Sequence, residues 1–308
     1  MTITNLLGIK YPIFQGAMAQ IARHELVSAV SNAGALGILA SGGVSPEELR
    51  KEIQQCKELT DKPFAVNLML MMSNIDEIID VVIEEGVKIV TTGAGTPRKF
   101  MPRLKEVGIK VIPVIPSVKA AVKMEELGCD AVVVEGMEAG GHVGTSTTMA
   151  LLPQVTSAVT IPVIAAGGIA DGRGMAAAYC LGASGVQMGT VFLASEECPV
   201  TDAYKNMILE AVDTSTTLTG EKFGAPVRGI KNELTKKYHE LEERSSTLME
   251  LEELTLGSLR RAVYDGDVEN GSVMAGQIAG LVNEICPVKN IIEDVIKEAR
   301  EVLKKTEI

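Results

Sequence analysis

Short apolar runs, rich in β-branched residues, recur along the first two thirds of the chain. Eight such runs, at intervals of about 20 to 30 residues, begin near Tyr11, Leu36, Phe64, Lys88, Lys110, Asp130, Ile161 and Gly185. Continuous apolar runs suit strands that are buried on both faces of a parallel sheet. An interval of this length holds one strand and one helix. The repeats therefore favour the α/β class, as a closed (β/α)8 TIM barrel rather than a doubly wound sheet.

Three stretches between these runs carry helix signals. Residues 45–59 open with Ser45 as N-cap, Pro46 at the first helical position and Glu48 three residues after the cap, which together form a capping box. Residues 74–86 and 117–128 place apolar side chains at helical spacing and end near a glycine. We therefore expect helices to alternate with the strands, as the barrel requires.

The pattern changes after Thr190, where the buried-strand runs stop. Residues 195–275 are charged and follow a helical period. We expect a barrel over residues 1–194, a smaller and mainly helical appended domain over 195–275, and a return segment over 276–308. The amphipathic stretch at the end of the return segment predicts a terminal helix that completes the outer ring of the barrel.

The composition excludes several classes of function. The net charge is −11 and no long Lys/Arg run occurs, which argues against nucleic-acid binding. The five cysteines are odd in number and form no CxxC pair, which is typical of a reduced, intracellular protein without a thiolate metal site. We find no secretory signal, no apolar run of the roughly 18 residues that a membrane span needs, and no dense cluster of metal ligands. We expect a cytoplasmic protein without a catalytic metal.

Two neighbouring strand ends finish in glycine. The run from Ile161 ends in Gly167-Gly168, and the run from Gly185 ends in Gly189-Thr190. In a (β/α)8 barrel the loops after strands seven and eight commonly hold a phosphate, which bare backbone N–H groups can bind. Each glycine on its own has the simpler interpretation of a tight turn. Two such ends on neighbouring strands, Gly167-Gly168 and Gly189-Thr190, together predict a phosphate-bearing ligand.

Other strand ends add residues that suit a flat, phosphorylated heteroaromatic such as FMN. Small residues at these ends let a ring system approach the backbone, and amide side chains can pair with ring carbonyl and N–H groups. Methionines at strand ends can line the ring pocket. The candidates are Gly16, Ala17, Met18, Asn67, Thr92, Glu135, Gln187 and Met188.

His142 is the histidine best placed for catalysis. It lies in the segment EAGGH (138–142), just after the sixth strand and at the end of the barrel where active sites form. The alternative interpretation is a surface or structural histidine. His24 and His239 lie on expected helices and are interpreted as surface residues. Cys198 follows the eighth strand, where a nucleophile is conceivable, but an ordinary loop cysteine fits better.

The sequence resembles a known family along nearly its whole length. It is similar to the flavin-dependent enoyl-acyl-carrier-protein reductase II enzymes, within the wider nitronate monooxygenase (2-nitropropane dioxygenase) group. Segments EAGGH and IAAGGIADG support the wider group, and the segments FGAPVRGIKN (223–232) and GSVMAGQ favour the reductase branch. The similar passages are YPIFQGAMA, AVSNAGALGI, LTDKPFAVN, VTTGAG, VIPSV, EGMEAGGHVG, IPVIAAGGIADGRG, FGAPVRGIKN and GSVMAGQIAG.

The resemblance implies FMN at the strand ends and His142 as the active-site histidine. Besides the residues already named, it implies flavin contacts from Gly141, Gly167, Gly168, Gly189, Thr190, Met274, Ala275, Gly276 and Gln277. It further implies a reductase that uses NADH or NADPH on an enoyl chain bound to the acyl carrier protein, and we expect a homodimer. Nitronate monooxygenase activity with the same flavin, and a phosphate-binding barrel without turnover, are the alternatives.

A basic group in the appended segment has two interpretations. Arg228, Lys231, Lys236 and Lys237 could steer the acidic carrier protein toward the site. An ordinary solvated helix face explains the same residues equally well.

Overall fold

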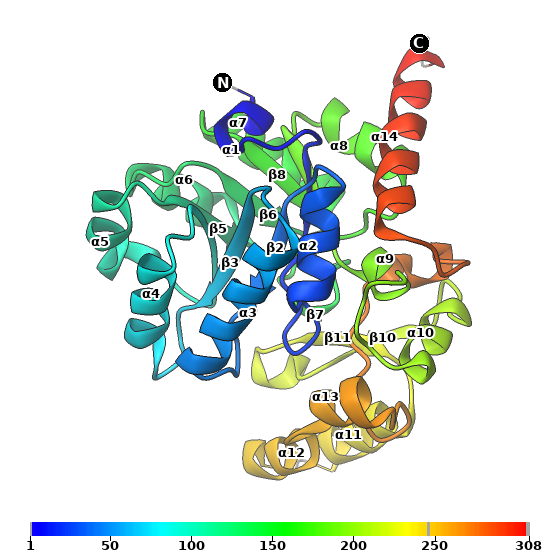
Figure 1. Cartoon of the computed structure of the whole chain (residues 1–308). Helices are drawn as coiled ribbons and strands as arrows, with labels where there is room; N and C mark the ends of the chain where they lie inside the picture. Colours follow the sequence, from blue (N-terminus) through cyan, green and yellow to red (C-terminus); the bar gives the residue numbers. More distant parts are fainter. Residues whose placement is uncertain (1, 245–246, 306–308) are drawn as a thin grey trace.

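The computed structural model describes residues 2–244 and 247–305. Eight parallel strands form one sheet in the order β1-β9-β8-β6-β5-β4-β3-β2, and a bridge between Phe14 and Leu36 closes it into a barrel. The predicted TIM barrel is therefore confirmed (Figure 1). Its strands are β1 (Ile13–Gln15), β2 (Gly37–Ala40), β3 (Phe64–Met69), β4 (Ile89–Gly93), β5 (Lys110–Ile115), β6 (Val132–Glu135), β8 (Val163–Ala166) and β9 (Gly185–Met188).

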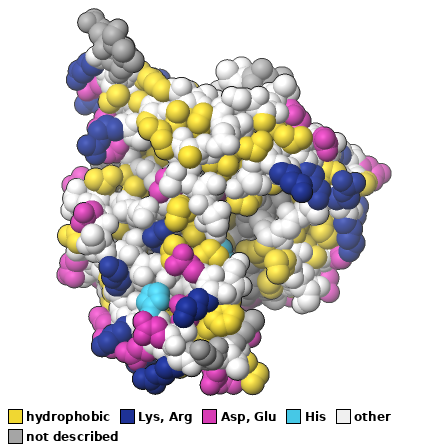
Figure 2. Space-filling view, turned by 180° about the vertical axis from the view of Figure 1, so that it is seen from behind, with side chains coloured by type: hydrophobic (Ala, Val, Ile, Leu, Met, Phe, Trp, Pro, Cys, Tyr) yellow, Lys and Arg dark blue, Asp and Glu magenta, His cyan; other side chains and the backbone are white. Residues whose placement is uncertain are grey.

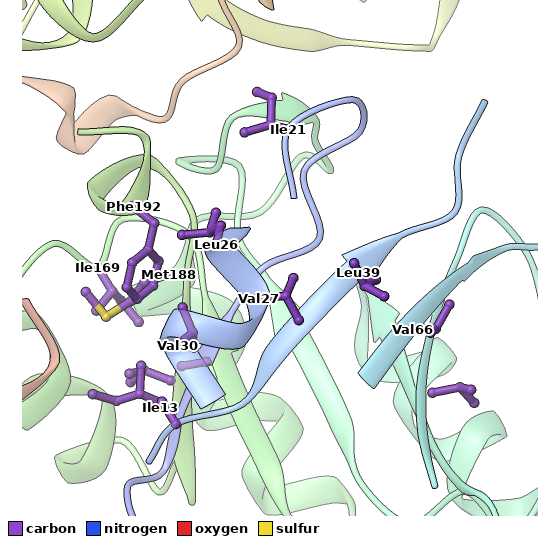
Figure 3. Close-up of a cluster of buried hydrophobic side chains, with 14 of the residues drawn as sticks. Ile13, Ile21, Leu26, Val27, Val30, Leu39, Val66, Ile169, Met188 and Phe192 are labelled. Carbon is purple, nitrogen blue, oxygen red and sulfur yellow. The ribbon is translucent and has the colours of Figure 1, made fainter. Parts of the chain in front are cut away.

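Alternation along the strands divides the core into two parts. Phe14 belongs to the cluster inside the barrel, together with Ile38, whereas the adjacent Ile13 and Leu39 belong to the cluster between strands and helices. Figure 3 shows side chains from this outer cluster, where α2 (His24–Asn32) packs against the barrel. Helix α1 (Ile3–Leu7) adds its buried side chains to the inner cluster.

The helices around the barrel follow the sequence signals. Ser45 and Glu48 form the predicted capping box at the start of α3 (Pro46–Leu59), and the Ser117 side chain caps α6 (Val118–Glu126). The remaining helices of the ring are α4 (Ile75–Glu84), α5 (Met101–Glu106), α7 (Thr148–Ala158) and α8 (Gly172–Cys180). Helix α14 (Val288–Lys305) packs against α8 and α2, in the part of the chain where the sequence predicts a terminal helix.

The appended segment contains strands as well as the expected helices. Strands β10 (Thr216–Thr219) and β11 (Val227–Ile230) form an antiparallel sheet with the short strand β7 (Gly141–His142). These strands are short and only partly buried, so they lack the continuous apolar run that marks the barrel strands. The helices here and after β9 are α9 (Thr190–Leu193), α10 (Asp202–Leu209), α11 (Glu233–Glu243), α12 (Leu248–Thr255) and α13 (Ser258–Arg260).

The small sheet lies between the barrel and the helices α11 to α13, as Figure 1 shows. Strand β7 comes from the barrel loop after β6, and its pairing with β11 joins the two parts of the molecule. None of the described helices combines the length and the apolar character needed to span a bilayer.

Candidate active site

A cleft lies at the carboxyl ends of β1, β6, β8 and β9, where the return segment covers it. The lining includes residues that the sequence predicted: Gly16, Ala17, Met18, Glu135, Gly167, Gly168, Gln187, Met188, Gly189, Thr190 and Gly276. It also includes residues that were not predicted as ligands: Glu138, Ala139, Gly140, Ala166, Ile169 and Ile278. The first three of these belong to the EAGGH segment, so proximity to His142 was a signal that could have identified them.

The glycine ends present unbonded backbone donors to this cleft. Gly167 and Gly168 have φ angles of +92° and +75°, a conformation that favours glycine. Among the residues that the structure describes, the N–H groups of Gly168, Gly189 and Thr190 donate no hydrogen bond. Buried or half-buried donors without partners are rare in folded proteins. These amides are therefore available to an anionic ligand.

The loop after β6 is held by Glu138. Its carboxylate accepts a hydrogen bond of 3.0 Å from the backbone N–H of Thr148, and the Thr148 hydroxyl lies 2.8 Å from the Gly167 carbonyl oxygen. A Cβ atom on Gly167 would lie 2.7 Å from the Gly136 carbonyl oxygen. The first glycine end is thus tightly packed against the loop that leads to His142.

Glu135 has a different environment from Glu138. It ends β6 and lines the cleft, and burial raises the pKa of its carboxyl to about 7. A carboxyl with this pKa exists in both protonation states near neutral pH, so it can either donate or accept a hydrogen bond to a ligand. Perturbed carboxyls in clefts are typical of functional sites.

The return segment and the residues just before it are fixed by hydrogen bonds. Gly276 N–H donates to Thr190 Oγ1 at 2.8 Å, and Gln277 N–H donates to the Glu138 carbonyl oxygen at 2.9 Å. The hydroxyl of the fully buried Tyr204 donates to the Met274 carbonyl oxygen at 3.0 Å. Gly276 therefore reaches the cleft, whereas Gln277 is exposed and Met274 and Ala275 lie outside its lining.

Two predicted residues lie deeper in neighbouring strands. Asn67 on β3 donates from Nδ2 to Thr91 Oγ1 at 2.9 Å, and Thr92 on β4 is buried. The Thr92 hydroxyl has no hydrogen-bond partner within the described part of the chain. Neither residue contributes to the lining of the cleft, although both stand near the same end of the barrel.

His142 is exposed on β7 and is outside the lining of the cleft. It follows Gly140, which lines the cleft, and Gly141, which does not. The imidazole is thus exposed to solvent, two residues along the chain from the lining of the cleft. In the face shown in Figure 2 the surface is hollowed, and hydrophobic side chains gather around the hollow.

The structure corrects the surface interpretation of His24. Its Nδ1 lies 3.0 Å from Glu52 Oε2, and its ring is partly buried. Arg23 pairs with the same carboxylate at 2.8 Å, so the residues form a network between α2 and α3. His239 is on α11 as expected, and its Nε2 lies 3.1 Å from the hydroxyl of Thr217.

Cys198 is buried, and desolvation raises the pKa of its thiol to about 11. A thiol with so high a pKa holds little of the thiolate that acts as a nucleophile near neutral pH. The ordinary loop cysteine is therefore the better interpretation.

The basic group in the appended segment is smaller than the sequence indicated. Lys231, Lys236 and Lys237 are exposed, but Arg228 is buried and burial lowers its pKa. Arg228 was thus wrongly grouped with the surface lysines. Its burial follows from the pairing of β11 with β7, which the local sequence does not reveal.

Comparison with known proteins places the chain in a family. The family model for nitronate monooxygenase matches residues 1–78 and 71–298. A probable nitronate monooxygenase from Staphylococcus saprophyticus is 36% identical over 98% of both chains. A relative from Mycobacterium tuberculosis, named (3aS,4S,5R,7aS)-5-hydroxy-7a-methyl-1-oxo-octahydro-1H-indene-4-carboxyl-CoA dehydrogenase, is 36% identical over 96% of this chain and 95% of its own.

A solved structure is similar to this chain over nearly its whole length, with a higher sequence identity than these two relatives. FabK from Thermotoga maritima is 51% identical, with a TM-score of 0.96 over 99% of this chain and 98% of that one. The barrel, the appended segment and the return segment are all within the matched range. The chain therefore belongs to the nitronate monooxygenase family.

Proposed function

We propose that the protein is an FMN-dependent enoyl-acyl-carrier-protein reductase that uses NADH or NADPH. Its substrate would be a trans-2-enoyl chain on the acyl carrier protein, reduced in the last step of fatty-acid elongation. The observation that carries the proposal is the similarity to FabK, the enoyl-acyl-carrier-protein reductase II, over nearly the whole chain. The more general function, that of an oxidoreductase of the nitronate monooxygenase family, does not depend on which specific reaction the protein catalyses.

The residues of the cleft fit FMN. The unbonded N–H groups of Gly168, Gly189 and Thr190 can hold the 5′-phosphate. The Gln187 side chain, which lines the cleft, can pair with polar atoms of the ring system. Bound FMN would supply a carrier of two electrons between the nicotinamide and the enoyl thioester.

The chain's own residues would handle the proton and the thioester. Reduction adds a hydride to the β-carbon and a proton to the α-carbon, while negative charge develops on the thioester oxygen. His142, exposed two residues along the chain from the lining of the cleft, can supply that proton or stabilise that oxygen. A solvent water could supply the proton in its place. Gly276 and Ile278, which line the cleft, would help exclude water from a bound ring system.

A second candidate function is the oxidation of alkyl nitronates with O2. The match to the nitronate monooxygenase model and the Staphylococcus relatives favour it. The same cleft would hold FMN, and His142 would act as the base. This reaction consumes oxygen and needs no NADH or NADPH, so the two functions are separable.

A visible spectrum of the purified protein tests the proposal. FMN-loaded protein should bleach when NADH or NADPH is added without oxygen, and should recolour when a trans-2-enoyl thioester follows. Recolouring by oxygen alone, together with nitronate oxidation, would replace the reductase with the monooxygenase. A colourless protein that takes up no FMN would reject both reactions and would favour a phosphate-binding barrel without turnover.

The proposal also includes two partners. We propose that the protein forms a homodimer and that it binds the acyl carrier protein.

A further inference from the structure

Arg228 is a buried arginine in the segment VRGIKN (227–232), and the cleft does not include it. Its residue exposure is 4%, and it forms no ion pair with a carboxylate of any described residue. Its Nε donates to the Met137 carbonyl oxygen at 3.1 Å, and its Nη1 donates to Thr216 Oγ1 at 3.2 Å. One guanidinium thus links the loop after β6 to strand β10.

Burial of a guanidinium without a paired carboxylate is costly, and the charges of Glu138 and Glu221 offset only part of that cost, because burial still lowers the pKa of Arg228. An apolar side chain of similar volume would fill the same space at a lower cost. Hydrogen bonding, rather than packing, therefore explains an arginine at this position. The planar guanidinium can serve two acceptors in fixed directions, which the single ammonium of a lysine cannot do.

The bonded carbonyl belongs to the loop that carries His142. Strand β7 pairs with β11 so that Arg228 lies opposite Gly141 and Val227 lies opposite His142. Because neighbouring residues of a strand face opposite sides, Arg228 and His142 lie on opposite faces of the small sheet. Arg228 thus holds the sheet from its buried face while His142 is presented on the exposed face.

We propose that Arg228 is a positioning residue for His142. By binding Met137 it fixes the loop from Gly136 to Gly140, and with it the register of β7 against β11. The place of the imidazole relative to the cleft then depends on this guanidinium. The role of His142 in this inference rests on the proposed function. The role of Arg228 in holding the loop does not depend on that function.

The test uses FMN-loaded Arg228→Met and Arg228→Lys proteins, with Arg300→Met as the matched control. Arg300 is exposed on α14, so the same chemical change there leaves the site intact. Hydrogen exchange of the amides in residues 137–143, measured by mass spectrometry, should be about tenfold faster in Arg228→Met. The kcat for a trans-2-enoyl thioester should fall about 10- to 100-fold, with little change in KM and with FMN retained.

A double-mutant cycle separates positioning from general destabilisation. If Arg228 acts through His142, Arg228→Met should cause no further loss of kcat in the His142→Ala background. Arg228→Lys keeps a donor that can reach Met137, so it should show a smaller fall in kcat than Arg228→Met and the same absence of effect in the His142→Ala background. The proposal would be overturned if the two substitutions lowered kcat independently, so that their effects multiply. It would also be overturned if Arg228→Met lost FMN, or if its amides in residues 137–143 exchanged at the wild-type rate.

The outcomes also distinguish this inference from the proposed function. A wild-type protein that reduces no enoyl thioester would reject the reductase, yet the exchange rates would still show whether Arg228 holds the loop. Wild-type activity combined with a normal kcat in both Arg228 variants would leave the reductase in place and reject Arg228 as a positioning residue.

Discussion

The backbone N–H of Gly276 donates a hydrogen bond of 2.8 Å to Thr190 Oγ1, and this bond ties the return segment to the end of β9. Thr190 also offers an unbonded N–H at the second glycine end. One threonine therefore belongs to the second glycine end of the cleft and also holds the segment that covers the cleft.

Replacement of that threonine should weaken both features. In Thr190→Val the buried Gly276 N–H loses its acceptor, which should lower the free energy of unfolding by about 1 to 3 kcal/mol. Affinity for FMN should fall in parallel, because the covering segment is no longer held. Thr190→Ser keeps the hydroxyl and serves as the control. Denaturant unfolding and fluorescence titration with FMN check the prediction, and a Thr190→Val protein equal to Thr190→Ser in both would contradict it.

The second prediction concerns His142. His142→Ala should lower the kcat for enoyl thioesters by about 10²- to 10⁴-fold, the usual contribution of a positioned acid or base. FMN should remain bound, because the imidazole is outside the lining of the cleft. Steady-state kinetics and the visible spectrum of the same preparation measure the two effects. Full turnover by the variant would remove His142 from the reaction.

The third prediction compares two glycines with similar, positive φ angles. Gly168 and Gly224 have φ angles of +75° and +72°, so alanine strains the backbone equally at both. At Gly168 the new Cβ would lie 3.3 Å from Glu138 Cβ, within the cleft, whereas at Gly224 it would meet open space. Gly168→Ala should raise the Kd for FMN well beyond the effect of Gly224→Ala, while both should lose about 1 to 3 kcal/mol of stability. Equal FMN affinities would argue against a phosphate at the first glycine end.

The sequence predicts the barrel because its signals are local. Ile13 and Phe14 face opposite sides of one strand, but both are apolar, so the run is visible without knowledge of its partners. The double glycines are equally visible, because they end runs of the same kind. Arg228 is different, since its acceptor Met137 lies 91 residues away and only the pairing of β11 with β7 brings them together. His24 was misjudged for the same reason, because Glu52 reaches it from the next helix.

The fourth prediction concerns the exposed lysines of the appended segment. If Lys231, Lys236 and Lys237 steer an acidic carrier protein, their replacement by glutamate should raise KM for the carrier-bound substrate and leave KM for a coenzyme A thioester unchanged. Arg228 is left out because it is buried. The effect should shrink as salt is added, since exposed charges are screened. An equal rise in KM for both substrates, or for neither, would reject this surface as the docking site.

The fifth prediction follows from Glu135, whose carboxyl pKa is raised by burial from 4.5 to about 7. Between these two pH values the folded protein binds more protons than the unfolded chain, so the free energy of unfolding falls as pH rises. The contribution lost between pH 4.5 and pH 8 is about 3 kcal/mol. Glu135→Gln cannot ionise, so its unfolding free energy should lack this decline. Denaturant unfolding of FMN-free wild-type and Glu135→Gln proteins at pH 5 and pH 8 measures the difference, and parallel pH profiles would show that the carboxyl ionises as freely in the folded protein as in the unfolded chain.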